Sequence, residues 1–400
     1  MAYPPVRGVL QRNYNLLREL GRRSEVHVLA FDQPESRPRG VAAQDCTRAL
    51  KEFCAHVQWL PLPRGARRAA RYWLAARGVV CRDAFDIQWL QSHRMRHTLQ
   101  EQLNRIKFDI VHFDTLGLAQ YRSLAKGFPA VLNHHNVESA MERRRAESTR
   151  NFLSAAYFRH EAQRLSVAER YWCPQFAVNL VVSPDDERVL RSSVPGIRTA
   201  VVPNGVDCEY FTPRVDPDRK TLLFCGGLDW YPNEDAMRFF FDSIWPSLST
   251  QVRDVKMYVV GRNPPRWLLA LSSRDPRISV PGFVEDIRPY GARAAAYVCP
   301  IRCGGGTRLK VLDALAMGIP FIGTAFSCSG LSVNHGEHVL LADRPEEFIT
   351  RVREVLDSVA LRKALVEAGR SLTEREYSWR VVGESLFKAY GSVRHVGNGS

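Results

Sequence analysis

The sequence has no run of 18 apolar residues, so its pattern predicts no helix that crosses a bilayer. Residues 1–7 lack the apolar core of a signal peptide, and we therefore expect a protein of the cytoplasm. The nine cysteines include no repeated Cys-x-x-Cys pair, and Cys299 and Cys303 have no second pair that would complete four zinc ligands. These absences favour reduced, buried thiols and no metal site.

Signatures of nucleic-acid-binding proteins are also absent, because the sequence contains no helix-turn-helix, zinc-finger or RNP pattern. Charge alone favours an anionic partner. The formal net charge is +14, and residues 1–200 carry 31 Lys and Arg against 19 Asp and Glu, whereas residues 201–400 carry 25 against 23. The first half therefore suits lipid headgroups, lipid phosphates or nucleic acid. Steeply salt-dependent DNA binding would single out the last of these.

What the sequence does contain is an alternation of short β-rich runs with helical patterns, over a chain long enough for two domains. Such alternation predicts an α/β fold with parallel sheets covered on both faces and functional loops at the carboxyl ends of the strands. The predicted strands are 25–31, 110–113, 130–133, 178–183, 199–203, 221–225, 255–260, 296–299, 321–324 and 339–341. The predicted helices are 12–22, 95–106, 185–191, 234–241, 310–316, 345–357 and 360–370.

The domain limits follow from a turn-rich segment near the middle of the chain, residues 210–217, which predicts a linker. We expect an N-terminal domain (1–209), a C-terminal domain (218–376) and a final helix (377–396) that crosses back to the N-terminal domain, with Tyr377 and Trp379 as apolar anchors. Residues 391–400 read as a frayed tail.

The start of the chain departs from this pattern, because a Pro-Pro turn and a helix come first, without a leading strand. We expect that the first strand of the N-terminal domain is missing, by a truncation of about ten residues.

The most informative stretch, residues 300–320, follows a predicted strand, turns through three glycines and enters a helix. Glycines let the backbone approach a ligand, and amides at a helix start point at an anion. Arg308 and Lys310 add positive charge at this end, which is unfavourable by up to about 1 kcal/mol each unless an anion binds. Together with Asp313, which suits hydroxyl groups, the set favours phosphate plus ribose over a plain glycine turn with solvated cations.

This stretch resembles the donor-binding motif of family 4 of the retaining glycosyltransferases. Five further segments are similar to that family in the same order along the chain: residues 3–17 (first loop and helix), 133–139 (histidine loop), 203–207, 224–228 and 282–286. The resemblance extends over nearly the whole chain. It implies the GT-B fold, in which two facing Rossmann-like domains with parallel sheets leave an interdomain cleft, and a nucleotide-diphosphate sugar as donor substrate, with no metal or other cofactor.

The resemblance assigns a ribose-binding role to Asp313. In relatives a second acid lies eight positions earlier and contacts the donor sugar, and Gly305 stands there instead. The Arg and Lys that usually follow the first strand of the C-terminal domain are also missing: Gly227 holds the Arg position, and the Lys position falls at residues 232–233. We expect Arg308 and Lys310 to supply the missing charge at the diphosphate.

The predicted donor-binding set also includes Phe283 and Val284 beside the base and Gly8 in the N-terminal loop that approaches the diphosphate. In full it is Gly8, Gly227, Phe283, Val284, Gly305, Gly306, Thr307, Arg308, Leu309, Lys310 and Asp313.

In the N-terminal domain the resemblance makes His135 the predicted catalytic residue, because the matching histidine contacts the donor sugar near the reacting carbon and helps stabilise an oxocarbenium-like state. His135 comes just after a predicted strand, where a cleft would open. We expect its neighbour His134 to be packed or hydrogen-bonded within the sheet. Glu138 fits two roles equally, a carboxylate that caps the next helix or a contact to the acceptor.

Two basic segments are predicted to face the acceptor or a membrane. Residues 64–77 have helical spacing, with Arg67 and Arg71 outward and Trp73 at an anionic membrane surface, although a solvated amphipathic helix over the sheet fits as well. Arg143 and Arg144 follow the histidine loop. They suit either the phosphate of a lipid-linked acceptor or an exposed helix face.

The resemblance implies a retaining, metal-independent glycosyltransferase that moves a sugar to a saccharide or lipid-linked acceptor. The expected setting is bacterial surface polysaccharide or glycolipid assembly, in the cytoplasm or at the inner face of the membrane, without nucleic acid as a partner. The alternatives are a nucleotide-sugar epimerase, for which no further acid–base residues are evident, and a non-catalytic relative, suggested by Gly305.

Overall fold

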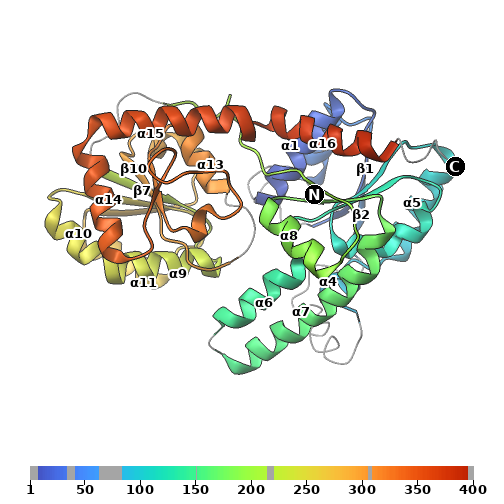
Figure 1. The fold of residues 1–400 in the computed structure, drawn as a ribbon, viewed down its shortest axis with the longest axis horizontal. Coiled ribbons are helices and arrows are strands. Elements are labelled where there is room, and N and C mark those ends of the chain that lie inside the picture. Colours follow the sequence, from blue (N-terminus) through green and yellow to red (C-terminus); the bar gives the residue numbers. More distant parts are fainter. Residues whose placement is uncertain are drawn as a thin grey trace. The chain divides into compact units, whose positions relative to one another are not determined.

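The computed structural model describes residues 8–33, 41–62, 83–149, 151–213, 220–304 and 309–394 of the chain. The chain divides into two units, an N-terminal unit formed by Met1–Asn204 together with Trp379–Ser400, and a C-terminal unit formed by Gly205–Ser378 (Figure 1). The sequence places these limits at residues 209 and 377. None of the helices in the described ranges combines the length and the apolar character that spanning a bilayer requires.

The strands of the N-terminal unit are all parallel and form two sheets among the described residues. One sheet has two strands, β1 (His27–Asp32) and β2 (His56–Pro61). The other has the order β3-β4-β5-β6, with bounds Val111–Phe113, Ala130–Asn133, Val178–Val181 and Thr199–Val201. The missing first strand stays a prediction, since the first described element is a helix.

The helices of this unit cover both faces of the four-stranded sheet (Figure 1). They are α1 (Gly8–Gly21), α2 (Ala43–Lys51), α4 (Phe85–Trp89), α5 (His93–Arg105), α6 (Glu138–Ser148), α7 (Phe152–Trp172) and α8 (Pro184–Ser193), with a 3₁₀ segment at Leu116–Ala125. The last helix, α16 (Trp379–Arg394), closes the unit. Its Trp379 is 2% exposed and belongs to one apolar cluster with Leu16, Val131 and Leu180, so the C-terminal end of the chain completes the N-terminal core.

The C-terminal unit contains one parallel sheet of six strands in the order β9-β8-β7-β10-β11-β12. The strands are β7 (Thr221–Cys225), β8 (Lys256–Val260), β9 (Ile278–Gly282), β10 (Ala296–Cys299), β11 (Phe321–Gly323) and β12 (Leu340–Leu341). The helices are α9 (Tyr231–Phe239), α10 (Trp245–Gln251), α11 (Arg266–Arg274), α12 (Arg288–Gly291), α13 (Leu309–Ala316), α14 (Pro345–Asp357) and α15 (Val359–Leu372). Both units therefore have the Rossmann-like architecture expected from the sequence.

Two predictions about the last part of the chain are wrong. Tyr377 does not anchor the N-terminal domain, because its ring lies in the core of the C-terminal unit and its hydroxyl accepts a hydrogen bond of 2.8 Å from the Ser332 amide. The helix α16 continues through Arg394, so the predicted frayed tail begins too early. Part of the predicted linker is also packed, since Phe211 is 6% exposed in the same core.

Candidate functional site

The strand order of the C-terminal unit determines where a ligand fits. The chain runs from β7 outward to β9 and then returns to β10 on the other side of β7. Loops that follow β7 and β10 therefore diverge at this switch point, which is where open α/β sheets bind ligands, outside the carboxyl ends of the strands. The predicted glycine turn follows β10, and the segment Gly226-Gly227 follows β7.

The turn at Gly226-Gly227 is closely surrounded by the ends of neighbouring side chains. A Cβ on Gly226 would lie 2.8 Å from Asn233 Nδ2 and 2.9 Å from Lys310 Nζ. In the neighbouring loop a Cβ on Gly261 would lie only 1.8 Å from the Gly226 carbonyl oxygen. The backbone at the end of β7 is thus bare and held closely by its neighbours, a geometry that lets a ligand approach the main chain.

Lys310 lies beside this turn, as the sequence analysis predicted for a cation at the start of α13. Its ammonium group donates a hydrogen bond of 2.7 Å to Asn233 Oδ1 and lies 4.3 Å from the centroid of the Phe224 ring. Asn233 in turn donates to the Gly227 carbonyl oxygen over 2.7 Å. This chain of contacts holds one full positive charge at the end of β7.

A second cation at the turn, Arg262, was not predicted. It follows β8, the strand next to β7, and its Nε lies 3.2 Å from Asp229 Oδ1. A Cβ on Gly227 would lie 3.3 Å from the same Nε, so the guanidinium borders the glycine turn. The signal was available in the sequence as a Gly-Arg-Asn-Pro-Pro segment directly after a predicted strand.

Asp313 lies one helical turn after Lys310 in α13, and its Oδ1 is buried without a hydrogen-bond partner among the described residues. Burial raises the pKa of Asp313 to about 7, and the nearby Lys310 opposes that shift. A buried carboxylate oxygen without a donor is unfavourable by about 1–3 kcal/mol. The site therefore suits a ligand that brings hydroxyl donors.

Other predicted donor-binding residues lie at the same edge or outside the described residues. Phe283 and Val284 directly follow β9, and Phe283 is 59% exposed. Leu309 is the first residue of α13, and Gly8 is the first residue of α1 in the N-terminal unit. The rest of the predicted glycine turn, Gly305, Gly306, Thr307 and Arg308, lies outside the described residues.

In the N-terminal unit, the structure brings His135 together with an acid that the sequence analysis missed. Asp114 directly follows β3, His135 follows the adjacent strand β4, and His135 Nε2 lies 3.3 Å from Asp114 Oδ2. The pair is at ion-pair distance without the alignment of a hydrogen bond. Burial works against the charged carboxyl group, but His135 and His112 outweigh it and hold the pKa of Asp114 well below its usual value.

A chain of hydrogen bonds orients Asp114 from behind. Asn133 Nδ2 donates to Asp114 Oδ1 over 2.9 Å, and Asn13 Nδ2 donates to Oδ2 over 2.5 Å. Arg12, which is 1% exposed, donates to Asn133 Oδ1 over 3.4 Å and to the Val202 carbonyl over 2.8 Å. Because Arg12 takes the Asn133 oxygen, the amide nitrogen is left to hold the carboxylate.

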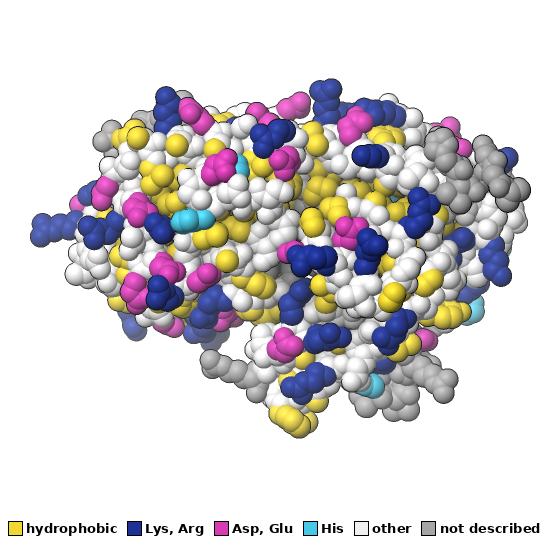
Figure 2. Space-filling model, viewed as in Figure 1, with side chains coloured by type: hydrophobic (Ala, Val, Ile, Leu, Met, Phe, Trp, Pro, Cys, Tyr) yellow, Lys and Arg dark blue, Asp and Glu magenta, His cyan; other side chains and the backbone are white. Residues whose placement is uncertain are grey.

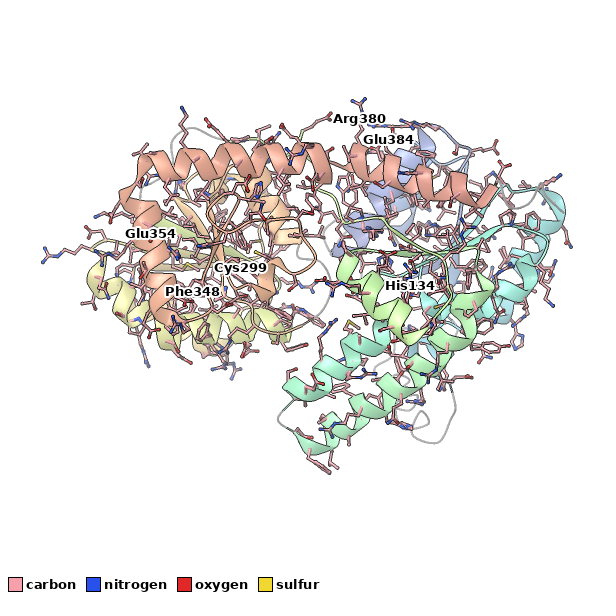
Figure 3. All side chains as sticks on the ribbon, in the orientation of Figure 1. His134, Cys299, Phe348, Glu354, Arg380 and Glu384 are labelled. Carbon is pink, nitrogen blue, oxygen red and sulfur yellow. The ribbon has the colours of Figure 1, made fainter. Side chains whose placement is uncertain are left out.

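His134 has the structural role that the sequence analysis assigned to it. It is 2% exposed inside the N-terminal unit (Figure 3), and its Nε2 lies 3.2 Å from Asn179 Oδ1. Burial lowers the pKa of His134 to about 4, so this ring is neutral at pH 7. The two adjacent histidines therefore differ: His134 is packed in the core, and His135 lies beside Asp114.

Glu138 lies next to this cluster and does not follow the capping prediction. Its Oε1 accepts a hydrogen bond of 3.0 Å from Thr115 Oγ1, and the residue at the N-cap of α6 is Val137. Burial first, and then Asp86, raise the pKa of Glu138 to about 8, so the carboxyl group is largely protonated at pH 7. Protonated, it can donate as well as accept a hydrogen bond.

Several buried polar atoms around His135 lack hydrogen-bond partners among the described residues. They are Asn13 Oδ1, Asn136 Oδ1 and Glu138 Oε2. Native proteins rarely leave such a group of buried polar atoms unsatisfied, because each one is unfavourable by about 1–3 kcal/mol. The cluster therefore suits a ligand with several hydroxyl groups.

Among the basic residues predicted to face an acceptor or a membrane, the two that the structure describes differ in exposure. Arg143 is exposed on α6, whereas Arg144 is half-buried with its Nε buried. Arg144 lies near enough to Asp186 to lower that group's pKa, although burial raises it on balance. Arg67, Arg71 and Trp73 lie outside the described residues.

Solved structures of similar fold cover nearly the whole chain. Sucrose-phosphate synthase from Thermosynechococcus elongatus superposes with a TM-score of 0.69 at 16% identity, over 98% of this chain and 94% of that one. Anabaena HepE, in complex with UDP and glucose, gives a TM-score of 0.63 at 12% identity, over 92% of this chain and 100% of that one. At these identities the similarity shows the fold, GT-B, and not the activity.

Sequence comparisons give the family. A protein of the cps region of Klebsiella pneumoniae, itself uncharacterised, is 22% identical over 175 residues, which are 42% of this chain and 45% of that relative. This chain thus matches less than half the length of the relative. The family model for glycosyl transferases group 1 matches residues 219–358, and the model for glycosyltransferase family 4 matches residues 6–210. The chain therefore belongs to glycosyltransferase family 4 and has the GT-B fold.

Proposed function

We propose that the protein transfers a sugar from a nucleoside diphosphate sugar to an acceptor hydroxyl, with retention of configuration and without a metal ion. The observation that carries the proposal is the position of Lys310 and Arg262 beside the bare Gly226-Gly227 turn. Two cations and a main chain open to close approach, at the switch point of a parallel sheet, suit a pyrophosphate.

In this proposal the C-terminal unit binds the nucleotide. The diphosphate lies along the Gly226-Gly227 turn, Asp313 accepts hydrogen bonds from the ribose hydroxyls, and Phe283 packs on the base. The leaving diphosphate gains negative charge as its bond to the sugar breaks. Lys310 and Arg262 then stabilise the transition state more than the ground state, which is the condition for a higher rate.

The N-terminal unit acts on the sugar. His135, positioned by Asp114, contacts the hydroxyls of the donor sugar and favours its oxocarbenium-like state. The acceptor oxygen attacks the anomeric carbon on the face that the diphosphate leaves, so the C–O bond to phosphate breaks and a C–O bond to the acceptor forms. The acceptor proton passes to the departing phosphate oxygen, and the configuration is retained.

We further propose a saccharide or lipid-linked acceptor and a role in bacterial surface polysaccharide or glycolipid assembly, in the cytoplasm or at the inner face of the membrane. The match to a protein of the cps region supports this pathway, and HepE and the pneumococcal O-GlcNAc transferase GtfA, both solved with UDP, make UDP-sugars the first donors to test.

The experiment is a thermal-shift screen of the purified chain against UDP, GDP, ADP and their sugars, followed by a transfer assay with the donor that stabilises it. Binding of one nucleotide series and transfer with an α-anomeric product from an α-linked donor would support the proposal. Conversion of the donor without any acceptor would instead indicate an epimerase. Donor binding without transfer or hydrolysis would indicate a non-catalytic protein, and no binding at all would refute the donor site.

A further inference from the structure

The helices α6 and α7 form an antiparallel hairpin that extends away from the sheets of the N-terminal unit (Figure 1). Small buried residues, Ala146 on α6 and Ala155 on α7, let the helices approach closely. The guanidinium of Arg145 lies 4.0 Å from the centroid of the Phe158 ring, which joins the two helices near their connection. The hairpin is therefore a packed element with a defined tip.

Two large apolar side chains occupy that tip. Phe152 is 75% exposed and Leu153 is 76% exposed, more than any other large apolar side chain that the structure describes. They are held in the first turn of α7, because the Asn151 side chain caps the helix and accepts a hydrogen bond of 2.9 Å from the Ser154 amide. The two exposed side chains thus lie in the ordered first turn of a helix.

The outer face of α7 continues from the tip as a basic and apolar stripe. Exposed residues recur every three or four positions and so share one face of the helix: Phe152, Ala156, Arg159, Gln163, Val167 and Arg170. The acids of α7 are turned inward, since Glu161 is 5% exposed and pairs with Arg164, and Glu169 is fully buried. Figure 2 shows hydrophobic side chains at the end of the hairpin and Lys and Arg side chains above them.

We propose that the hairpin tip and the outer face of α7 dock the protein on the surface of an anionic lipid bilayer. Phe152 and Leu153 enter the boundary between headgroups and acyl chains, and Arg159 and Arg170 lie at the level of the headgroup phosphates. An amphipathic helix with cations on its polar side and large apolar residues beside them is suited to this interface.

The shape of the surface favours lipid over a protein partner. A stable protein interface buries about 800 Å² per partner over a well-packed area, whereas the apolar part of this surface is a narrow tip and a single helix stripe. A bilayer surrounds such a tip on all sides, so two side chains contribute fully. The inference rests on the membrane setting proposed above but not on the transfer reaction.

The test measures flotation of the full chain with vesicles, in the absence of any donor. Vesicles of 70% phosphatidylcholine and 30% phosphatidylglycerol are compared with pure phosphatidylcholine. We expect binding to the anionic vesicles that weakens as salt is raised. The double variant Phe152→Ser/Leu153→Ser should bind at least about fivefold less, and Arg159→Glu/Arg170→Glu should remove the preference for anionic vesicles.

Val359→Ser provides the matched control, because Val359 is 61% exposed on the C-terminal unit and its loss should leave vesicle binding unchanged. Wild-type protein that stays unbound, or a tip variant that binds like wild type, would overturn the proposal. A wild-type dimer that the tip substitutions convert to a monomer would overturn it as well, by assigning the tip to a second copy. Thermal shifts with the nucleotide donor should be equal in all these variants. A failed vesicle assay would therefore not argue against the donor site, and a failed thermal-shift assay would not argue against the docking surface.

Discussion

Replacing Asp313 by Asn should make the protein more stable at pH 8 and at the same time weaken its binding of the donor. The carboxyl group is held in a site that disfavours its charge, since burial raises its pKa from the ordinary 3.8 to about 7. Between these two pH values the unfolded chain has lost the proton and the folded chain keeps it. Folding therefore takes up a proton, and the folded state becomes less stable as pH rises from about 4 to about 7.

The size of the change in stability follows from the size of the pKa shift of Asp313. About 3 pKa units correspond to about 4 kcal/mol, and the true penalty is smaller because the side chain of Asp313 is partly accessible to water. We expect Asp313→Asn to add about 2 kcal/mol to the free energy of unfolding of the C-terminal unit at pH 8, or about 4–8 °C in its melting temperature. Below about pH 3 the two proteins should be nearly equally stable, because Asp313 is then largely protonated in both the folded and the unfolded state.

The pH dependence of donor affinity has the opposite sign to the pH dependence of folding stability. Ribose hydroxyls donate to the ionised carboxylate and lower its pKa, so binding releases a proton and wild-type affinity should rise about tenfold from pH 5.5 to 7.5 and then level off. A nucleoside diphosphate sugar is the ligand to titrate calorimetrically, because its diphosphate does not change charge in this range. The Asn variant should bind more weakly and without this pH dependence. A flat profile for wild type, or the same slope in the variant, would refute the assignment of Asp313 to the ribose.

Three further outcomes can be measured on the same preparations. Lys310→Ala and Arg262→Ala should each lower donor affinity about tenfold, whereas Arg274→Ala, an exposed arginine at the end of α11, should not change it. Asp114→Asn should lower kcat about tenfold or more and leave the calorimetric Kd for the nucleotide unchanged, because it removes only the support of His135. Gly261→Ala should lower the free energy of unfolding by about 3 kcal/mol in chemical denaturation, since its Cβ would lie 1.8 Å from a backbone oxygen.

Much of the fold was predictable because the central strands of the two larger sheets, among them β4, β7 and β10, are buried on both faces and bounded by turn residues. The strands β4, β7 and β10 have the predicted bounds, as does the helix α14. Two strands at the outer ends of their sheets were missed, β2 and β9. Their half-exposed patterns mix polar residues and proline with the apolar ones. Neither the two-residue period of a strand nor the 3.6-residue period of a helix therefore stands out.

The helix α7 was missed for a related reason. It is the longest helix among the described residues, yet its apolar residues are divided between a buried side and an exposed side. A helix that is apolar on one face only gives a clear period, and α7 does not. The same feature that hid this helix from the sequence analysis, an exposed apolar stripe, is what marks it as a docking surface.

The sequence predicted residues of the candidate site that follow a predicted strand within a recognisable segment. It did not predict contacts between residues from two distant segments. Lys310 and His135 follow predicted strands within recognisable segments, and the structure places both at strand ends. Asp114 also follows a predicted strand, but nothing in the sequence pairs it with His135, because the register of β3 beside β4 makes that contact. Strand order, which periodicity does not reveal, decides such pairs.

In the proposed donor site, Arg262 takes over the role of an arginine that the family resemblance would put at position 227. Relatives carry an arginine in the loop after the first strand of the C-terminal domain, where this chain has Gly227, and Arg262 comes from the loop after the next strand. Adjacent strands lie about 4.8 Å apart, less than the length of an arginine side chain, so a guanidinium from either loop can reach the same point. The attraction between a cation and a diphosphate depends on that point and not on the loop of origin. Moving the arginine back, in the double variant Gly227→Arg/Arg262→Ala, should therefore restore more donor affinity than Arg262→Ala retains alone, and a double variant no better than the single one would show that Arg262 acts through Asp229 and the loop rather than on the ligand.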